Sequence, residues 1–372
     1  MRISVYIHVP FCRYKCVYCD FISYPILDTN LYERYVQELI REIRWWRRVL
    51  PDYKLYTVYI GGGTPSVLPR KLLSLIAKEI NRWGVPEEFT IEANPEDITS
   101  EWIDFILDLG ITRISIGVQT FNDNLLMAWN RHHTSTETQL ALEIVREKGV
   151  NFNVDLIYPI YLPESIEYNF EYDVEKAISF NPPHVSLYIM DIYPGTIADV
   201  FVKKRQWSDK MTDNLYSNMQ WLYDFMGVHN YVHYEISNFA LEGFESKHNM
   251  VYWRQEFYLG VGISAWGFVN FVRYRNLPTI REYISGNVVR EFYRVSRNDL
   301  LSEYGIMALR LINEGINRRR WEMLGGNWEH LKRRASSIKC LFVSDRNIFL
   351  LNSPKCVLFS NTVIEELFEP WL

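Results

Sequence analysis

Three cysteines lie close together near the start of the chain, at Cys12, Cys16 and Cys19, with the spacing C-x3-C-x2-C. Three thiolates held this closely can ligate three irons of one [4Fe-4S] cube, which leaves the fourth iron open to another molecule. A Cys3His zinc site and a chance group of buried thiols are the alternatives. Because no second C-x2-C pair follows, we predict an iron–sulfur cluster at these three residues.

The other two cysteines, Cys340 and Cys356, lie far from this group and share no ligand spacing. An odd number of cysteines in a long chain argues against a disulfide framework. We therefore expect both thiols to be free and dispensable for the cluster, in a reducing cytoplasm. The first ten residues do not resemble a secretory signal, and no apolar run approaches the ~20 residues that span a bilayer. Any membrane association is expected to be peripheral at most.

Composition excludes few functions. Hydrophobic residues make up 48% of the chain and the net charge is −5, so we expect no general nucleic-acid binding. The basic run Arg318–Arg320 is more typical of a solvated helix face. Aromatic residues are abundant, with 25 Tyr, 20 Phe and 12 Trp. We interpret these aromatic residues mainly as large core side chains; the alternative is that some of them form a site for a flat ligand.

The cysteines must be positioned by the elements around them, and the first half of the chain alternates β-rich runs with helical patterns. The runs cover residues 3–9, 56–62, 89–94, 113–119, 152–158 and 184–190. This alternation predicts an α/β fold with parallel strands, either a barrel of six β/α units or part of one, although an open doubly wound sheet would show the same pattern. Several runs are apolar at successive positions, which predicts strands buried on both faces.

The pattern changes after residue 195. Apolar residues from Trp207 to Met226 recur at helical spacing, which predicts a long helix that ends at Gly227. From about residue 297 the order becomes helix, helix, hairpin, helix, which predicts a compact winged-helix-like α+β domain. We divide the chain into a barrel at 1–200, a barrel extension at 201–290 and this C-terminal domain at 291–372.

Polar residues and glycines mark the predicted strand ends. The run 61–65, GGGTP, follows the second strand, where glycines let the backbone approach a ligand closely. Glu92 ends the third strand, Gln119 ends the fourth, and Asp155 lies in the fifth. Because the carboxyl ends of barrel strands converge on one mouth, these residues are predicted to line a single site.

The motifs YIHVPFC, CDF, YIGGGTP, IEANP, SIGVQTFND, RHHT, DLIY, YEISNFA and HNMVYW together resemble one branch of the radical S-adenosylmethionine (SAM) superfamily. That branch is the HemW haem-chaperone group of the anaerobic coproporphyrinogen III oxidase-like family. The resemblance runs from residue 3 to about residue 372. It implies that the amino and carboxylate groups of SAM chelate the open iron, and that an electron from the cluster cleaves SAM to methionine and a 5'-deoxyadenosyl radical.

The resemblance also implies a set of SAM contacts. They are Tyr6, Tyr18, Gly62, Gly63, Thr64, Glu92, Gln119, Arg131 and Asp155. The last three correspond to a region that holds a second SAM in the true oxidase, and whether a second SAM binds here stays open.

Two features separate the chaperone from the oxidase. The true oxidase carries a further cysteine just after the third, whereas here Asp20 and Phe21 follow Cys19. The HNMVYW segment contains His248, whose imidazole is the haem ligand that the resemblance implies; a hydrogen-bonded structural histidine is the alternative. The chain departs from the family at Trp266, where relatives have a histidine, and in an altered loop at Pro159.

The leading interpretation is a HemW-like radical SAM protein that binds haem or a porphyrin and hands haem to an acceptor protein, with an electron donor such as flavodoxin or ferredoxin. The alternatives are an oxygen-independent coproporphyrinogen III oxidase and a radical SAM enzyme that acts on an unrelated substrate.

Overall fold

A computed structural model describes residues 1–286, 288 and 290–369. Residues 287, 289 and 370–372, which fall within the predicted second and third domains, lie outside this described part. The proposed division at 200/201 and 290/291 stays a prediction.

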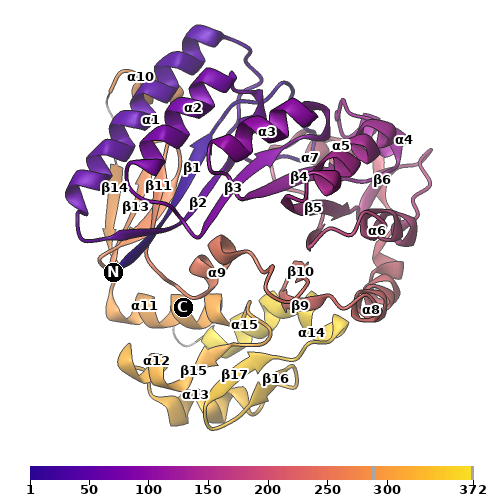
Figure 1. Ribbon diagram of the computed structural model, residues 1–372. Coiled ribbons are helices and arrows are strands. Elements are labelled where there is room, and N and C mark those ends of the chain that lie inside the picture. Colours follow the sequence, from indigo (N-terminus) through magenta and orange to yellow (C-terminus); the bar gives the residue numbers. More distant parts are fainter. Residues whose placement is uncertain (287, 289, 370–372) are drawn as a thin grey trace.

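The centre of the molecule is one open sheet whose parallel strands follow the chain order (Figure 1). These strands are β1 (Arg2–Val9), β2 (Lys54–Gly62), β3 (Glu88–Ala93), β4 (Arg113–Gln119), β5 (Asn151–Tyr158) and β7 (His184–Ile189). All six predicted runs are therefore strands, and the α/β architecture is confirmed. Since the two edges of the sheet do not pair with each other among the described residues, the barrel is partial rather than closed.

Helices cover the outer face of this sheet (Figure 1). They are α1 (Thr29–Val49), α2 (Arg70–Asn81), α3 (Ser100–Asp108), α4 (Asp123–Ala128), α5 (Ser135–Glu147) and α6 (Phe170–Ile178). Helix α1 begins where the Asp28 carboxylate accepts hydrogen bonds from the first backbone amides, and it buries Tyr35, Leu39 and Ile43 in the core. The sequence periodicity predicted this helical face correctly.

The two faces of the parallel strands differ in chemistry. Ile3, Val5 and Ile7 of β1 belong to the main hydrophobic core. The alternate residues of the strands form a polar inner face, which is shown by hydrogen bonds between side chains of different strands. Those bonds join Ser4 to Thr57, Tyr59 to Glu92, Ser115 to Asp155, and Asn153 to His184. The strands are buried on both faces, as the sequence predicted. Their inner face is polar all the same, because small and polar residues alternate with the large apolar ones.

The sheet is extended at both edges. At one edge β11 (Tyr258–Val261) pairs parallel with β1 and is followed by the antiparallel strands β12 (Trp266–Val269), β13 (Val272–Asn276) and β14 (Arg290–Arg294). At the other edge lie β10 (Asn238–Ala240) and β9 (Val232–Glu235). Helix α7 (Ile197–Lys203) follows β7, α9 (Lys247–Trp253) lies between β10 and β11, and α10 (Ile280–Ile284) lies between β13 and β14.

The helix predicted from Trp207 is shorter than expected. Trp207 starts a short strand, β8 (Trp207–Asp209), which pairs with β6 (Tyr161–Pro163). Helix α8 begins only at Thr212 and runs to Val228. Trp207 matched the helical spacing because its ring is buried, and burial alone does not distinguish a strand from a helix.

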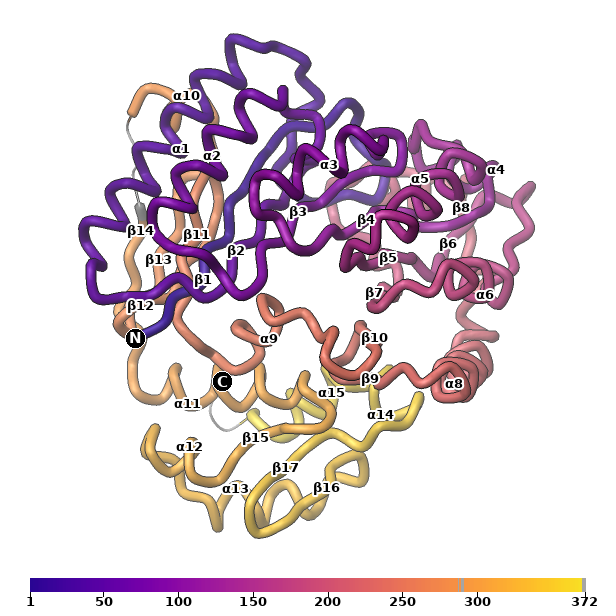
Figure 2. Tube along the Cα trace, in the orientation of Figure 1, coloured from indigo at the N-terminus to yellow at the C-terminus, as the bar shows by residue number. Residues whose placement is uncertain are grey.

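The C-terminal segment has its own hydrophobic core, which includes Trp321, Trp328 and Phe368. Its elements are α11 (Arg297–Ala308), β15 (Ile316–Asn317), α12 (Arg318–Met323), α13 (Trp328–Ala335), β16 (Leu341–Val343), β17 (Asn347–Leu350), α14 (Pro354–Leu358) and α15 (Ser360–Phe368). The three strands form a separate small sheet. The predicted winged-helix-like arrangement is confirmed, and Figure 2 shows it in yellow-orange on the side of the sheet away from α1 and α2.

Cys340 and Cys356 are joined in a disulfide, which corrects the expectation of two free thiols. Cys340 directly precedes β16, and its carbonyl accepts a hydrogen bond from the Leu351 amide at 2.9 Å. Helix α14 then turns back beside this pair, so that the two Cα atoms lie 5.2 Å apart, within the usual range for a disulfide. Sequence spacing did not reveal this proximity, because the intervening hairpin creates it.

None of the helices in the described ranges has the length and apolar composition required to cross a bilayer.

Candidate functional site

The three cysteines lie in the loop between β1 and α1. Backbone hydrogen bonds hold this loop at several points: Cys12 N donates to Tyr24 O at 3.1 Å and Cys19 N donates to Cys16 O at 3.2 Å. All three thiols are free and partly buried. The loop is therefore anchored to Tyr24 at Cys12 and closed by an internal turn from Cys16 to Cys19, and all three cysteines keep partial exposure.

Two side chains direct hydrogen-bond donors at these sulfurs. The Thr64 hydroxyl lies 3.7 Å from Cys12 Sγ, and an Arg131 guanidinium nitrogen lies 3.6 Å from Cys16 Sγ. Burial raises the pKa of the Cys12 thiol, so such donors favour the ionised form that ligates iron.

The arrangement fits a cluster better than a single ion. Within the ranges that the structure describes, no three His, Cys, Asp or Glu side chains are grouped to hold one metal ion. An iron–sulfur cube does not need its thiolates to converge on one point, since each binds a different iron. Three free thiols with charged and hydroxyl donors on their sulfurs are a suitable ligand set for it.

The glycine run is packed tightly against the strand that leads into the cysteine loop. Gly62 has φ +108°, and a Cβ atom added there would lie 2.3 Å from the His8 ring. A Cβ on Gly63 would lie 2.6 Å from the Phe11 carbonyl oxygen. The amides of Gly63 and Thr64 donate to Val9 and Phe11 at 2.7 Å. Glycine is therefore required here by close backbone approach, and the run holds Thr64 beside Cys12.

Glu92 links the glycine run to the inner face. Its carboxylate accepts hydrogen bonds from the Tyr59 hydroxyl at 2.8 Å and from the Gly62 amide at 3.1 Å. Burial, with a smaller contribution from the charge of Asp155, raises the pKa of Glu92 to about 7. The inner face encloses most of this carboxylate and leaves it some solvent exposure, and a carboxyl poised near neutrality suits a cationic ligand group.

Arg131 connects the cysteine loop to the end of β4. Its guanidinium donates to the Gly117 carbonyl at 2.6 Å and to the Asn94 side chain at 3.0 Å, in addition to its contact with Cys16. Gln119, at the last position of β4, has a φ of 70°, a backbone conformation that few non-glycine residues adopt. The strand end and the cysteine loop therefore meet at Arg131.

The remaining predicted SAM contacts lie on the same side of the sheet. Asp155 accepts hydrogen bonds from Ser115 at 3.0 Å and Asn153 at 2.7 Å. The Tyr6 hydroxyl is 3.1 Å from His8 Nδ1, and Tyr18, which lies between Cys16 and Cys19 in the loop, packs its ring edge-on against Trp129. The predicted convergence of strand ends is thus matched by the geometry, whereas the roles of these residues stay predictions.

His248 is not part of this group. It lies in α9 and is 1% exposed, and Nδ1 is 2.7 Å from the Thr57 hydroxyl while Nε2 is 2.8 Å from the Tyr252 hydroxyl. Burial lowers the pKa of His248 to about 3. Glu88, the first residue of β3, accepts hydrogen bonds from the His248 and Lys247 amides at 3.0 Å.

Helix α9 therefore closes the amino end of the strands, whereas the cysteine loop lies at the carboxyl end. Figure 1 shows α9 between the sheet and the C-terminal domain. With both nitrogens of its ring in hydrogen bonds, His248 has no lone pair free for iron, and the geometry favours the structural alternative. Its assignment as a haem ligand stays a prediction without support from these contacts.

Two further residues, Trp266 and Tyr59, are now placed by the structure. Trp266 is 42% exposed on β12, stacked 6.1 Å from the Tyr293 ring, so this departure from the family replaces an imidazole with a surface indole. Tyr59, which donates to Glu92, was not among the predicted site residues. The alternation in YTVYIGG places it on the same face as Gly61, and this signal could have indicated it.

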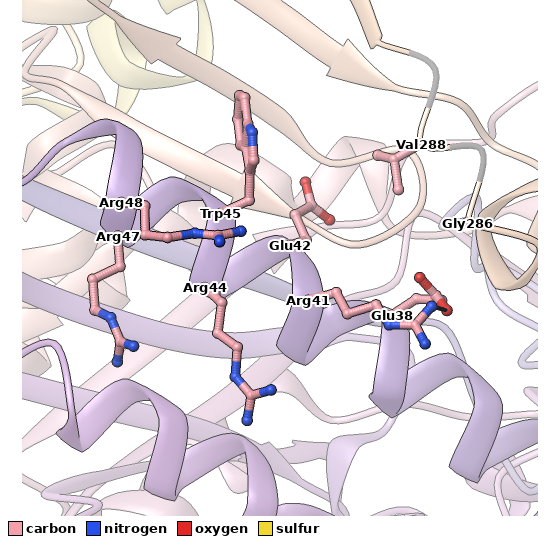
Figure 3. A pocket seen from close by; sticks show the side chains of 9 residues that line it. All are labelled: Glu38, Arg41, Glu42, Arg44, Trp45, Arg47, Arg48, Gly286 and Val288. Carbon is pink, nitrogen blue, oxygen red and sulfur yellow. Dashed lines mark hydrogen bonds and ion pairs between the residues drawn. The ribbon is translucent and has the colours of Figure 1, made fainter.

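The outer surface carries a groove of about 780 Å³ that is unrelated to this site (Figure 3). Its lining residues are Glu38, Arg41, Glu42, Arg44, Trp45, Arg47, Arg48, Gly286 and Val288. Arg44 and Arg47 form ion pairs with Glu79 of α2 at 2.9 and 3.0 Å. The groove contains none of the predicted site residues, and these ion pairs explain much of its charge.

Comparison with known proteins identifies the family. Residues 6–168 match the radical SAM superfamily. The heme chaperone HemW of Lactococcus lactis is 38% identical over 292 residues, which cover 76% of this chain and 73% of the relative, and that of Bacillus subtilis is 32% identical over 86% of both chains. The coproporphyrinogen III oxidase HemN of Escherichia coli has the same fold, with a TM-score of 0.81 and 20% identity over 98% of this chain and 90% of its own. Membership of the superfamily implies a [4Fe-4S] cluster and SAM. The chain belongs to the HemW branch of the radical SAM superfamily.

Proposed function

We propose that this protein binds a [4Fe-4S] cluster through Cys12, Cys16 and Cys19, binds SAM beside it, and binds haem for transfer to an acceptor protein. The observation that carries the proposal is the three-thiol loop, fixed against a glycine run, in a chain that aligns with heme chaperones over most of its length. The oxidase alternative has less support, because the cysteine that follows the third one in that enzyme is absent.

The bound cluster supplies one electron and one open iron position for SAM. The surrounding residues prepare its place. Thr64 and Arg131 stabilise charge on the sulfurs, and the closely packed glycine run holds Thr64 beside Cys12. Glu92 offers a carboxylate to the cationic part of SAM, and Arg131 offers a guanidinium to an anionic part.

The other predicted contacts surround this place. They are Tyr6, Tyr18, Gly62, Gly63, Gln119 and Asp155. An electron donor such as flavodoxin or ferredoxin would reduce the cluster, and a haem-accepting protein would receive the cargo.

An anaerobic haem titration of the reconstituted protein, read by the Soret band, tests the haem part of the proposal. We expect a saturable shift in the wild type and in the surface control His229→Ala. Because His248 is buried with both nitrogens occupied, we expect His248→Ala to lower the melting temperature and to keep the Soret shift.

Three other results are informative. No shift in the wild type would refute haem binding. A His248→Ala protein that is as stable as wild type but lacks the shift would instead place haem at HNMVYW. Formation of protoporphyrinogen IX from coproporphyrinogen III with SAM under anaerobic conditions would favour the oxidase.

A further inference from the structure

The inner face of the sheet holds a buried arginine without an acceptor. Arg113, the first residue of β4, is 2% exposed. Its side chain makes no hydrogen bond or ion pair with any residue in the described part of the chain, and its Nε atom is fully buried and unpartnered. A buried guanidinium is costly unless an anion or several acceptors accompany it.

The neighbours of Arg113 in the sheet share this property. In the strand register, Thr90 of β3 and Asn151 of β5 are its direct partners on either side. Thr90 Oγ1 and Asn151 Oδ1 are also buried without a hydrogen-bond partner. We call these three residues the Arg113 row. One step further along the strands the polar groups are satisfied, since Ser115 and Asn153 bond to each other and to Asp155.

The nearby carboxylates are committed to other donors. Glu88 accepts the two amides at the start of α9, and Glu92 accepts Tyr59 and Gly62. Burial lowers the pKa of the imidazole of His184 on the inner face, and the positive charge of Arg113 lowers it further. The charge of Arg113 also opposes the burial that raises the pKa of Asp155, but no carboxylate of the described chain forms an ion pair with Arg113.

We propose that the Arg113 row binds the carboxylate group of a small ligand that enters between the carboxyl ends of the strands. The guanidinium fork matches a carboxylate, the Thr90 hydroxyl adds a donor, and the Asn151 amide can turn its NH2 group inward. Entry is from that end because Glu92 and Asp155 above the row are partly exposed, whereas α9 closes the other end. A ligand anchored in this way would have its far end beneath the predicted SAM site.

This inference is independent of haem transfer and can be tested with formate as the smallest carboxylate. Thermal unfolding of the anaerobically reconstituted protein is followed at increasing sodium formate, with formamide as the neutral control of equal size. At formate concentrations about ten times its Kd, the melting temperature of the wild type should rise by roughly 2 °C. Arg113→Met should lose this rise, and Arg146→Met, which removes an exposed arginine of α5, should keep it.

A wild type that responds equally to formate and formamide would overturn the proposal and leave only water at the row. A formate response that survives in Arg113→Met would overturn it as well. Where Arg113→Met does not fold, Arg113→Lys keeps the charge without the fork. It should then need a several-fold higher formate concentration for the same rise, and an unchanged titration midpoint would contradict the assignment.

Discussion

Removal of the Tyr59 hydroxyl should make the stability of this protein depend more steeply on pH. Tyr59 donates to Glu92 at 2.8 Å, and the second donor to that carboxylate is the Gly62 amide. A carboxyl ionises at about 4.3 in an unfolded chain, and Glu92 ionises at about 7 in the folded protein, chiefly because it is buried. The folded state thus holds this proton more tightly. The stability that this provides is complete below about pH 4.3 and is lost as the pH rises through 7.

The Tyr59→Phe substitution removes a donor to the ionised form. A hydrogen bond to a charged group contributes about 1.5–3 kcal/mol, whereas one to a neutral group contributes about 1 kcal/mol. The pKa of Glu92 should therefore rise further, by about one unit or somewhat more. We expect the variant to be about 1 kcal/mol less stable than wild type at pH 5.5, and about 1.5–3 kcal/mol less stable at pH 8.5.

Thermal unfolding of matched reconstituted samples at the two pH values measures this difference, which corresponds to roughly 2–4 °C at pH 8.5 for a chain of this size. In a Glu92→Gln background the cost of Tyr59→Phe should no longer depend on pH. The control is Tyr56→Phe on the same strand, whose ring lies against the Arg2 guanidinium, 4.0 Å from the ring centroid. A Tyr59→Phe cost that is equal at both pH values, or that keeps its pH dependence without Glu92, would refute the reasoning.

Three further changes test other parts of the structure. Cys16→Ala should retain no four-iron cluster after anaerobic reconstitution, and normal iron and sulfide contents would reject the ligand assignment. Gly62→Ala should cost roughly 3 kcal/mol in thermal unfolding, because it combines a positive φ with a clash against the His8 ring. Gly195→Ala, at φ +87° in open space, should cost only about 1–2 kcal/mol, and equal costs would show that the clash relaxes. Reductant should lower the stability of the wild type by about 3 kcal/mol, because it opens the loop that the Cys340–Cys356 disulfide closes over a separation of 16 residues. It should change neither the stability of Cys340→Ser nor the iron content. A Cys340→Ser protein that reductant destabilises would contradict this.

The strand order and the meeting of cysteines, glycines and Glu92 could be predicted from sequence because each depends on local pattern. Six β/α units bring the carboxyl ends of their strands to one side whatever the side chains are. The polar inner face could not be read as easily. In runs such as ISIGV the inner positions are filled by serine and glycine, which interrupt an apolar pattern only weakly. The Cys340–Cys356 pair was missed for a different reason, since the fold of the hairpin, rather than any spacing, brings the two residues together.

The HNMVYW segment shows how a motif can look like a ligand set and have a structural explanation. Its histidine and tyrosine fill the amino end of the inner face, where the His248 ring lies 5.3 Å from that of Tyr59. At the other side of α9, the Arg310 guanidinium of the C-terminal domain lies 4.6 Å over the Trp253 ring, and Arg254 forms an ion pair with Glu314. The segment therefore joins the C-terminal domain to the strand that holds Glu92 in place. A substitution that displaces α9 should also displace Tyr59 and thereby disturb the Glu92 carboxylate. A loss of SAM or haem binding on mutation of this motif would therefore not by itself identify a ligand.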